Sequence, residues 1–269
     1  MKLYIVHSTT YRYASSATYS IQTLKLTPRR DASQRTLSWR LQAPGRRVEQ
    51  LDAFGNLTHL MTLEGPHTEV SLRAEGVIET DDSYAGTLAA DNTFSPLVYV
   101  NATSLTQASE AIDALAARIF GEAAATRNTA QKLIDAVAET VSYQPGTTVV
   151  SDTASEVITR GEGVCQDQAH VAIAICRAAG IPARYVSGYI LGADAAQASS
   201  HAWVDIWLGS ESAWLSCDIT HGALAGPRLC RLAVGRDYLD AAPVRGVRRG
   251  GGREQLEVHV SVADSANQQ

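Results

Sequence analysis

The chain has 269 residues, a length that allows one large domain or two modest ones with ample apolar material for a core. A formal net charge of −5 and an isoelectric point near 5.8 argue against a nucleic-acid partner or an anionic membrane surface. No apolar run approaches the ~20 residues of a membrane-spanning helix, and the start of the chain lacks a signal peptide's long apolar region. We therefore expect a cytoplasmic protein with no membrane partner.

The first hundred residues alternate between apolar and polar side chains, as strands do when one face is buried. Clear examples are residues 20–26 and 70–74, and Pro-Gly and Gly-Pro pairs mark turns between such runs. Many short strands separated by turn signals are typical of a β-sandwich. We therefore predict a β-sandwich domain over residues 1–100, followed by a second domain over residues 101–269.

The second part of the chain mixes helical and strand patterns. Apolar residues recur at helical spacing over residues 105–120 and 129–141, which predicts two amphipathic helices. Residues 166–179 are apolar almost all round, with Asp167 and Arg177 as the only charged side chains, so this helix should be buried at the centre of its domain. Strands are expected over residues 183–191, 201–208, 213–219 and 255–262. A central helix packed on an antiparallel sheet is an α+β architecture.

Cys165 stands at the predicted start of the buried helix. The unpaired N–H groups and the positive end of the helix dipole at that place favour negative charge on the sulfur. The same N–H groups are candidate hydrogen-bond donors to the oxyanion of a tetrahedral intermediate. Gly161 and Gly163 allow a sharp turn that leaves the sulfur open to a substrate. Cys165 is therefore a candidate nucleophile.

A hairpin argument brings His201 and Asp218 together. Residues 209–212 have the composition of a turn, and if Leu208 pairs with Ala213, Trp203 lies opposite Asp218. His201 is two residues from Trp203, so it shares that face of the sheet and is a diagonal neighbour of Asp218, within reach of a long side chain. A slip of one residue in the register would place the two on opposite faces.

Each of these residues has a more ordinary explanation when it is taken singly. A cysteine at a buried helix start is usually a small hydrophobe, a histidine in a strand a polar surface residue, and an aspartate beside a turn a cap. The three together, each in the appropriate element, favour covalent cysteine catalysis.

Other polar residues are better explained by structure. Asp167 should complement the helix dipole, and His170 faces another side of the helix from Cys165. The Arg/Gly-rich segment 245–253 could bind a substrate carboxylate, but a solvated loop or a contact between domains is favoured. Asp205 is the first alternative to Asp218 as the catalytic acid.

The four cysteines give no sign of a metal site or of a disulfide. No two form a C-x-x-C pair, and no EF-hand loop is present, so we expect no metal and no cofactor. Cys165 and Cys176 lie 11 residues apart on one predicted helix, roughly 16 Å along its axis, so they cannot be bridged. Unpaired thiols fit a reducing compartment.

Motifs of one protein family occur along nearly the whole chain. In the second part they are GEGVCQD (161–167), AGIPARYVSGY (179–189), SHAW (200–203), VGRDY (234–238) and PVRG (243–246). In the first part they are HSTTYRY (7–13), LTPR (26–29) and DAFGN (52–56). With these stretches the chain resembles the bacterial transglutaminase-like cysteine proteases, with the N-terminal accessory domain of that family.

The resemblance implies a papain-like, transglutaminase-type fold that carries out acyl transfer through a cysteine thioester. Cys165 corresponds to the nucleophile, His201 to the base and Asp218 to the residue that orients the base. The loop after the acid usually reads Asp-Pro-Thr-Asn-Gly, but here it reads Ile-Thr-His-Gly after Asp218. Animal transglutaminases also carry an upstream tryptophan that stabilises the oxyanion, and this chain has no tryptophan between Trp39 and Trp203. The second oxyanion donor is therefore left open.

Water is the default acyl acceptor, so we expect a peptidase or amidase whose partner is a peptide or amide substrate, proteins included. One alternative is a transglutaminase, in which an amine accepts the acyl group. Another is a non-catalytic scaffold that binds peptides in a relic cleft. The sequence leaves the substrate and the oligomeric state open.

Overall fold

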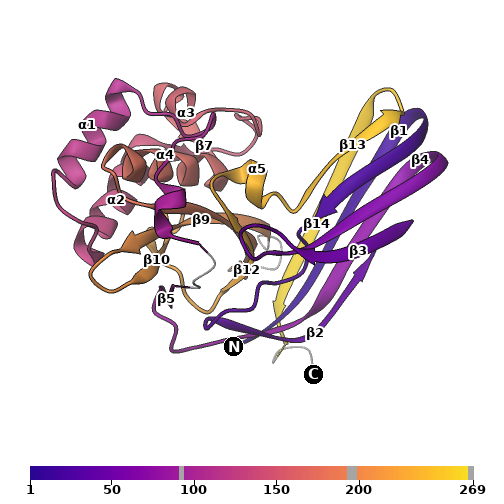
Figure 1. Cartoon of the computed structure of the whole chain (residues 1–269), viewed down its shortest axis with the longest axis horizontal. Coiled ribbons are helices and arrows are strands. Elements are labelled where there is room, and N and C mark those ends of the chain that lie inside the picture. The colour runs from indigo at the N-terminus through magenta and orange to yellow at the C-terminus, as the bar shows by residue number, and fades with distance from the viewer. Residues whose placement is uncertain (91–93, 193–198, 266–269) are drawn as a thin grey trace.

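The computed structural model describes residues 1–90, 94–192 and 199–265. Two antiparallel sheets pack together, and most of the helices gather around the second sheet, away from the first (Figure 1). Among the described residues, no helix is both long enough and apolar enough to cross a membrane. The cytoplasmic location stays a prediction.

The first sheet is centred on two long strands, β1 (Lys2–Leu24) and β4 (Leu57–Thr80), which are 23 and 24 residues long. They pair antiparallel along most of their length, with a register irregularity near the middle. Because both strands are so long, each outer edge is covered in two parts. The covering strands are β2 (Gln34–Gln42) and β3 (Arg46–Leu51) on β4, and β13 (Val244–Gly250) and β14 (Glu254–Asp264) on β1.

The strand-rich N-terminal part and the α+β core are as predicted. Hydrogen bonding joins the N-terminal strands into one sheet of six. The two halves of β4 nevertheless share one apolar cluster, to which Met61 contributes from one half and Leu72 and Ala74 from the other.

Strand pairing differs from the expected division of the chain at residue 100. β13 and β14 come from the C-terminal end of the chain and pair with β1, whereas β5 (Thr87–Ala89) pairs with a strand of the second sheet. The segment 245–253 is therefore largely a strand that joins the N-terminal sheet, which agrees with the expected contact between domains and not with a solvated loop. Local alternation identifies a strand but not its partner, because the partner depends on contacts between distant segments.

The second sheet is antiparallel in the order β11-β10-β9-β8-β12, with β5 beside β10. Its strands are β8 (Ala183–Ile190), β9 (Ser199–Leu208), β10 (Ala213–Asp218), β11 (Ala223–Leu224) and β12 (Leu229–Gly235). The helical elements are η1 (Pro96–Tyr99), α1 (Glu110–Ile119), α2 (Arg127–Thr140), α3 (Ala154–Arg160), α4 (Cys165–Ala178) and α5 (Tyr238–Ala241). A short parallel pair joins β6 (Ser142–Tyr143) to β7 (Glu162–Gly163).

The central helix α4 is buried along nearly its whole length, as its all-round apolar sequence predicts. Its side chains form one core with residues of β8, β9 and β10 and with the other helices. The prediction missed α3, which has only seven residues. Its start nevertheless carries a capping box, in which the side chains of Thr153 and Glu156 bond each other's backbone N–H groups.

A second apolar cluster holds the N-terminal sheet against the core. Leu3 and Ile5 of β1 pack on Tyr189 of β8 and Leu232 of β12. The next residue on the same face of β1, His7, places Nδ1 2.7 Å from the hydroxyl of Tyr189. The N-terminal sheet is therefore packed directly on the strand next to β9.

Candidate active site

The start of α4 presents Cys165 on the surface of an otherwise buried helix. The Val164 N–H donates to Oδ2 of Asp167 at 2.8 Å, and the Thr148 hydroxyl donates to the same oxygen at 2.8 Å. Asp167 therefore ties the helix start to the loop before it. Gly163 packs so tightly here that an added Cβ would lie 2.8 Å from the Cβ of Asp167. The tight turn leaves Cys165 partly exposed, whereas the chain's other three cysteines are buried.

β9 and β10 bring His201 and Asp218 together in the predicted register. Leu208 pairs with Ala213, as expected. His201 Nε2 lies 2.9 Å from Asp218 Oδ1, and the two side chains are only 4% and 5% exposed. The ring nitrogen is not aligned for a hydrogen bond, so the contact is an ion pair at short range. Because Nε2 faces Asp218, Nδ1 is the nitrogen available to Cys165.

The charges of the three groups support one another. Burial by itself would lower the pKa of His201, but the neighbouring Asp218 carboxylate and Cys165 sulfur raise that pKa to about 9. Burial would raise the pKa of Asp218, but the imidazoles of His201 and His221 lower it to about 2. A protonated imidazole between a carboxylate and a sulfur is therefore favoured at neutral pH.

His221 is a neighbour of this site that sequence reasoning did not assign. Its Nδ1 lies 2.9 Å from Asp218 Oδ2, and its ring centroid is 5.1 Å from that of His201. The sequence did carry one signal for His221, because this histidine stands where the usual Asp-Pro-Thr-Asn-Gly loop has asparagine. Asp218 thus has one imidazole on each oxygen.

The same three side chains are a group that could hold a metal ion. Their potential ligand atoms all lie within 4.8 Å of one another. Two of the three are the predicted catalytic His201 and Asp218, so an ion there would compete with the proton chemistry of the site. The absence of a metal requirement stays a prediction.

Asp205, the alternative acid, lies in a different environment. It is fully buried, and its Oδ2 accepts from Arg184 Nε at 2.9 Å and from Arg231 Nη1 at 2.6 Å. Its other oxygen accepts from the Ser216 hydroxyl at 2.6 Å. These contacts occupy both carboxylate oxygens of Asp205, and it is Asp218 that lies beside His201.

His170 is also structural in its contacts. Its Nε2 accepts the backbone N–H of Tyr238 at 3.1 Å, and its ring packs 5.2 Å from that of Tyr185. Burial lowers the pKa of His170 to about 3, so the ring is neutral. It helps to fix α5 on α4.

A pocket of about 290 Å³ opens beside Cys165 and His201. One wall belongs to the catalytic core and includes Tyr185 and Tyr238; the other belongs to the N-terminal sheet and includes Leu256. The reacting groups therefore lie where the two sheets meet.

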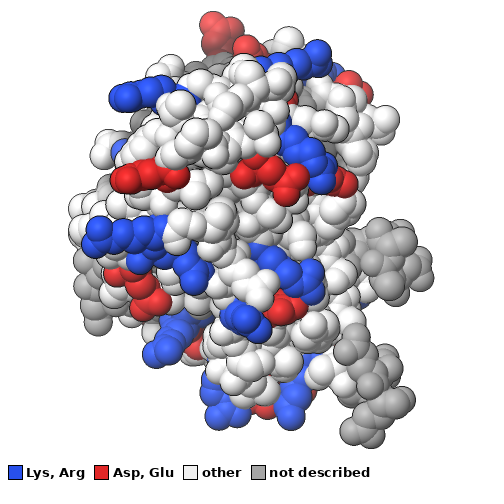
Figure 2. Space-filling model, turned by 90° about the vertical axis from the view of Figure 1, so that its right-hand side faces the viewer, with Lys and Arg blue, Asp and Glu red and all other residues white. Residues whose placement is uncertain are grey.

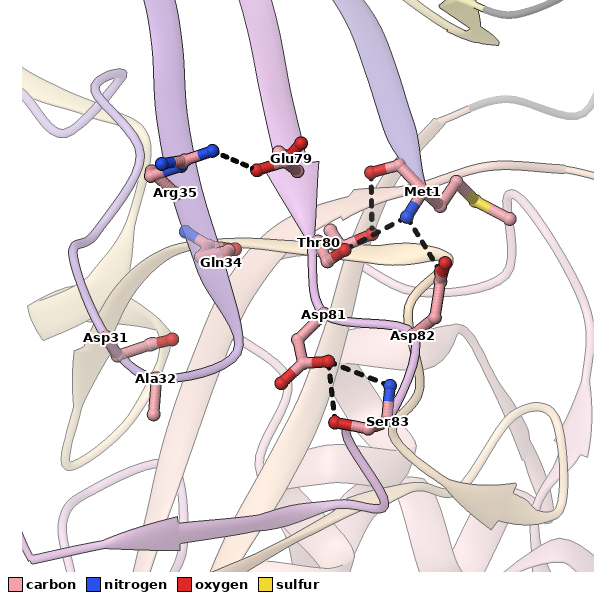
Figure 3. Close-up of a pocket in the computed structure, with 10 residues that line it drawn as sticks. All are labelled: Met1, Asp31, Ala32, Gln34, Arg35, Glu79, Thr80, Asp81, Asp82 and Ser83. Carbon is pink, nitrogen blue, oxygen red and sulfur yellow. Dashed lines mark hydrogen bonds and ion pairs between the residues drawn. The ribbon is translucent and has the colours of Figure 1, made fainter.

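A larger pocket of about 620 Å³ lies elsewhere, at one end of the N-terminal sheet (Figure 3). Its lining includes four carboxylates, but three of them already have partners within the pocket lining. Glu79 bonds Arg35, Asp81 bonds Ser83, and Asp82 bonds the amine of Met1. None of the predicted catalytic residues lines this pocket.

At pH 6, iodoacetamide should modify Cys165 faster than Cys176, Cys217 or Cys230. These three thiols are fully buried, and burial raises the pKa of each. Peptide mapping by mass spectrometry at short reaction times measures the order of labelling. The denatured protein serves as the control, since all four should then react alike. Equal or slower labelling of Cys165 in the native protein would remove the argument for an activated thiol.

A buried helix that begins with cysteine, packed on an antiparallel sheet that carries a histidine, defines a papain-like cysteine-protease fold. The transglutaminase-like superfamily matches residues 113–219, and the bacterial transglutaminase-like N-terminal region matches residues 3–79. "Uncharacterized protein ML0607" of Mycobacterium leprae is 30% identical, over 97% of this chain and 98% of its own length. The chain belongs to the transglutaminase-like superfamily.

Two further comparisons cover most of the chain. "Uncharacterized protein Rv2569c" of Mycobacterium tuberculosis is 29% identical, over 90% of this chain and 86% of the relative. The crystal structure of a "Putative Cysteine Protease from Cytophaga hutchinsonii" aligns with a TM-score of 0.77 and 25% identity, covering 98% of this chain and 90% of that chain. The family and this neighbour support a cysteine-dependent enzyme.

Proposed function

We propose that the protein is a cysteine hydrolase that cleaves peptide or amide bonds. Cys165 is the nucleophile, His201 carries the proton, and Asp218 orients and charges the imidazole. The observation that carries this proposal is the short contact between His201 and Asp218, with the Cys165 sulfur near the same ring. The description of the Cytophaga protein as a protease supports the same class of reaction.

The reaction has two halves. The sulfur of Cys165 attacks the amide carbonyl carbon, and the carbonyl π electrons move onto oxygen. The oxyanion then collapses, the C–N bond breaks, and His201 gives its proton to the leaving amine. In the second half His201 takes a proton from water as the water attacks the thioester. Breakage of the C–S bond releases the acid and restores the thiolate–imidazolium pair.

The oxyanion needs donors beside Cys165. The N–H groups of Cys165 and Gln166 lie in the first turn of α4, where a helix supplies no intrahelical acceptor. Tyr143 pairs with Gly163 through β6 and β7, close to the helix start. Burial, and then negative charge at Cys165, raise the pKa of Tyr143. Tyr143 is our candidate for the second donor.

Peptide and amide libraries test the hydrolase proposal directly. Turnover should depend on Cys165 and disappear in Cys165→Ala, which keeps the fold and removes the sulfur. A thiol-directed probe that fails to label native Cys165, together with no turnover in the library, would favour a non-catalytic scaffold instead.

Hydrolysis should dominate over amine transfer on any amide that the enzyme accepts. Both products arise from the same thioester, and a millimolar amine competes with water at ~55 M when the site binds the amine and orients it toward the thioester. The upstream tryptophan of animal transglutaminases has no counterpart in this chain. With millimolar primary amine present, mass spectrometry should find mainly the acid product.

The matched control for this competition is the same assay with Cys165→Ala, which measures uncatalysed hydrolysis and aminolysis. Amine conjugates as the main Cys165-dependent product would make the protein a transglutaminase. Such a result would leave the assignments of Cys165, His201 and Asp218 unchanged.

A further inference from the structure

The pocket beside Cys165 continues a face of β1 that is otherwise packed against the core. At the start of β1, the odd-numbered residues Leu3, Ile5 and His7 face the second sheet, and Leu3 and Ile5 are fully buried there. Further along the same face, Thr9 and Tyr11 line the pocket. The packed interface between the sheets therefore opens into a cavity at the level of the reactive sulfur.

The second strand of this wall is β14, in which apolar and polar side chains alternate between the two faces of the sheet. Val258 pairs with Thr9 and Leu256 with Tyr11, and both β14 residues line the pocket. Leu256 is 53% exposed and Val258 47% exposed, although both are apolar. On the opposite face, Glu257 bonds Arg12 at 2.9 Å. The apolar face of β14 is thus turned toward the nucleophile without being covered.

The pocket is uncharged apart from the reacting groups. None of the residues that line it is lysine, arginine, aspartate or glutamate. His7 is neutral, because burial lowers its pKa to about 4, and both of its ring nitrogens have hydroxyl partners. On the side of the molecule that carries the N-terminal sheet, Lys and Arg side chains are interspersed with Asp and Glu (Figure 2). A charged substrate group would lose hydration in this pocket and gain no partner of opposite charge.

We propose that this pocket binds an uncharged, apolar side chain of the substrate next to the scissile carbonyl, and that Leu256 and Val258 select it. The assignment rests on the proposed acyl-transfer role of Cys165. The volume of about 290 Å³ suits one large side chain, since it is at the low end of small-molecule sites at ~300–1,000 Å³. The N-terminal sheet, together with its C-terminal strand, is then part of the substrate site.

Alkylation of Cys165 tests the pocket without a known substrate. The probes are iodoacetamide, the apolar N-phenethyl-iodoacetamide and the cationic N-(2-aminoethyl)-iodoacetamide, with rates normalised to those of glutathione. The wild-type protein should favour the apolar probe over iodoacetamide by about tenfold or more and should disfavour the cationic probe.

The Leu256→Glu variant should lose the apolar preference and gain reactivity with the cationic probe by about tenfold. This gain cannot come from unfolding, since an unfolded chain would react with each probe as glutathione does. The control is Val247→Glu on β13, which makes the same kind of change at a residue that is 71% exposed and lies outside the pocket. It should keep the wild-type preferences.

Equal normalised rates for all probes in the wild-type protein would overturn the pocket assignment, as would an unchanged preference in Leu256→Glu. Hydrolysis assays on peptide amides separate this outcome from failure of the proposed function. Cys165-dependent hydrolysis without preference for large apolar side chains overturns the pocket alone. A strong probe preference that is lost in Leu256→Glu, together with no hydrolysis, supports the pocket and counts against the hydrolase.

Discussion

Replacing Asp218 with asparagine should lower turnover by roughly 10²–10⁴-fold while the protein keeps its fold. The carboxylate lies 2.9 Å from Nε2 of His201 and, together with the Cys165 sulfur, raises the pKa of the buried imidazole to about 9. An asparagine carries no charge. If its NH2 group faces His201, that group and the protonated ring nitrogen are both donors and cannot bond each other. His201→Ala should cost at least as much, because it removes the proton carrier.

The proton state of His201 gives a second measurement that needs no substrate. The carboxylate contributes to the high pKa of His201, so Asp218→Asn should move that pKa downward from about 9. The imidazole would then lose its proton at a lower pH, which NMR titration of the ring can detect. Near-normal turnover in Asp218→Asn, or an unmoved His201 titration, would show that Asp218 does not orient and charge the histidine.

Asp205→Asn should have the opposite profile: a large loss of stability and little loss of activity per folded molecule. Asp205 is fully buried between the guanidinium groups of Arg184 and Arg231, at 2.9 Å and 2.6 Å. Removing its charge leaves two buried positive charges without this carboxylate, which typically costs about 3–5 kcal/mol. Urea denaturation should report this decrease in the free energy of unfolding.

The pH dependence of this effect has a definite sign. Burial would raise the pKa of Asp205, but Arg231 and Arg184 lower it to about 2. The stability that the ionised carboxylate contributes is therefore present above the ordinary aspartate value of ~3.9 and is lost as the pH falls toward 2. The difference in the free energy of unfolding between the wild-type protein and Asp205→Asn should therefore become smaller as the pH falls over that range. Glu69→Gln is the matched control: it neutralises a carboxylate in a half-exposed ion pair with Arg12, and it should change the denaturation midpoint little.

These two aspartates show where sequence reasoning succeeds. A two-stranded hairpin is a local structure, so the turn at residues 209–212 determines the pairing of Leu208 with Ala213 and hence the approach of His201 to Asp218. The buried helix could also be predicted from local sequence, because a helix that is apolar on all sides is stable only inside a core. Cys165, at its first position, follows from the same pattern.

Other features depended on the tertiary structure. The sequence around Asp205 does not distinguish it from Asp218 as a candidate acid. Only the folded structure shows that Arg231 of β12 and Arg184 of β8 form ion pairs with Asp205. His221 resembles any turn residue until the loop folds back on Asp218.

The boundary between the two parts of the chain shows the same limit most clearly. The sequence by itself indicated β8, β9, β10 and β14, the central helix and the three candidate catalytic residues, because each depends on neighbours a few positions away. The pairing of β13 and β14 with β1 joins the two ends of the chain, and no local pattern encodes it. The pocket exists only because of that pairing, since Leu256 and Val258 reach Cys165 from the far end of the sequence.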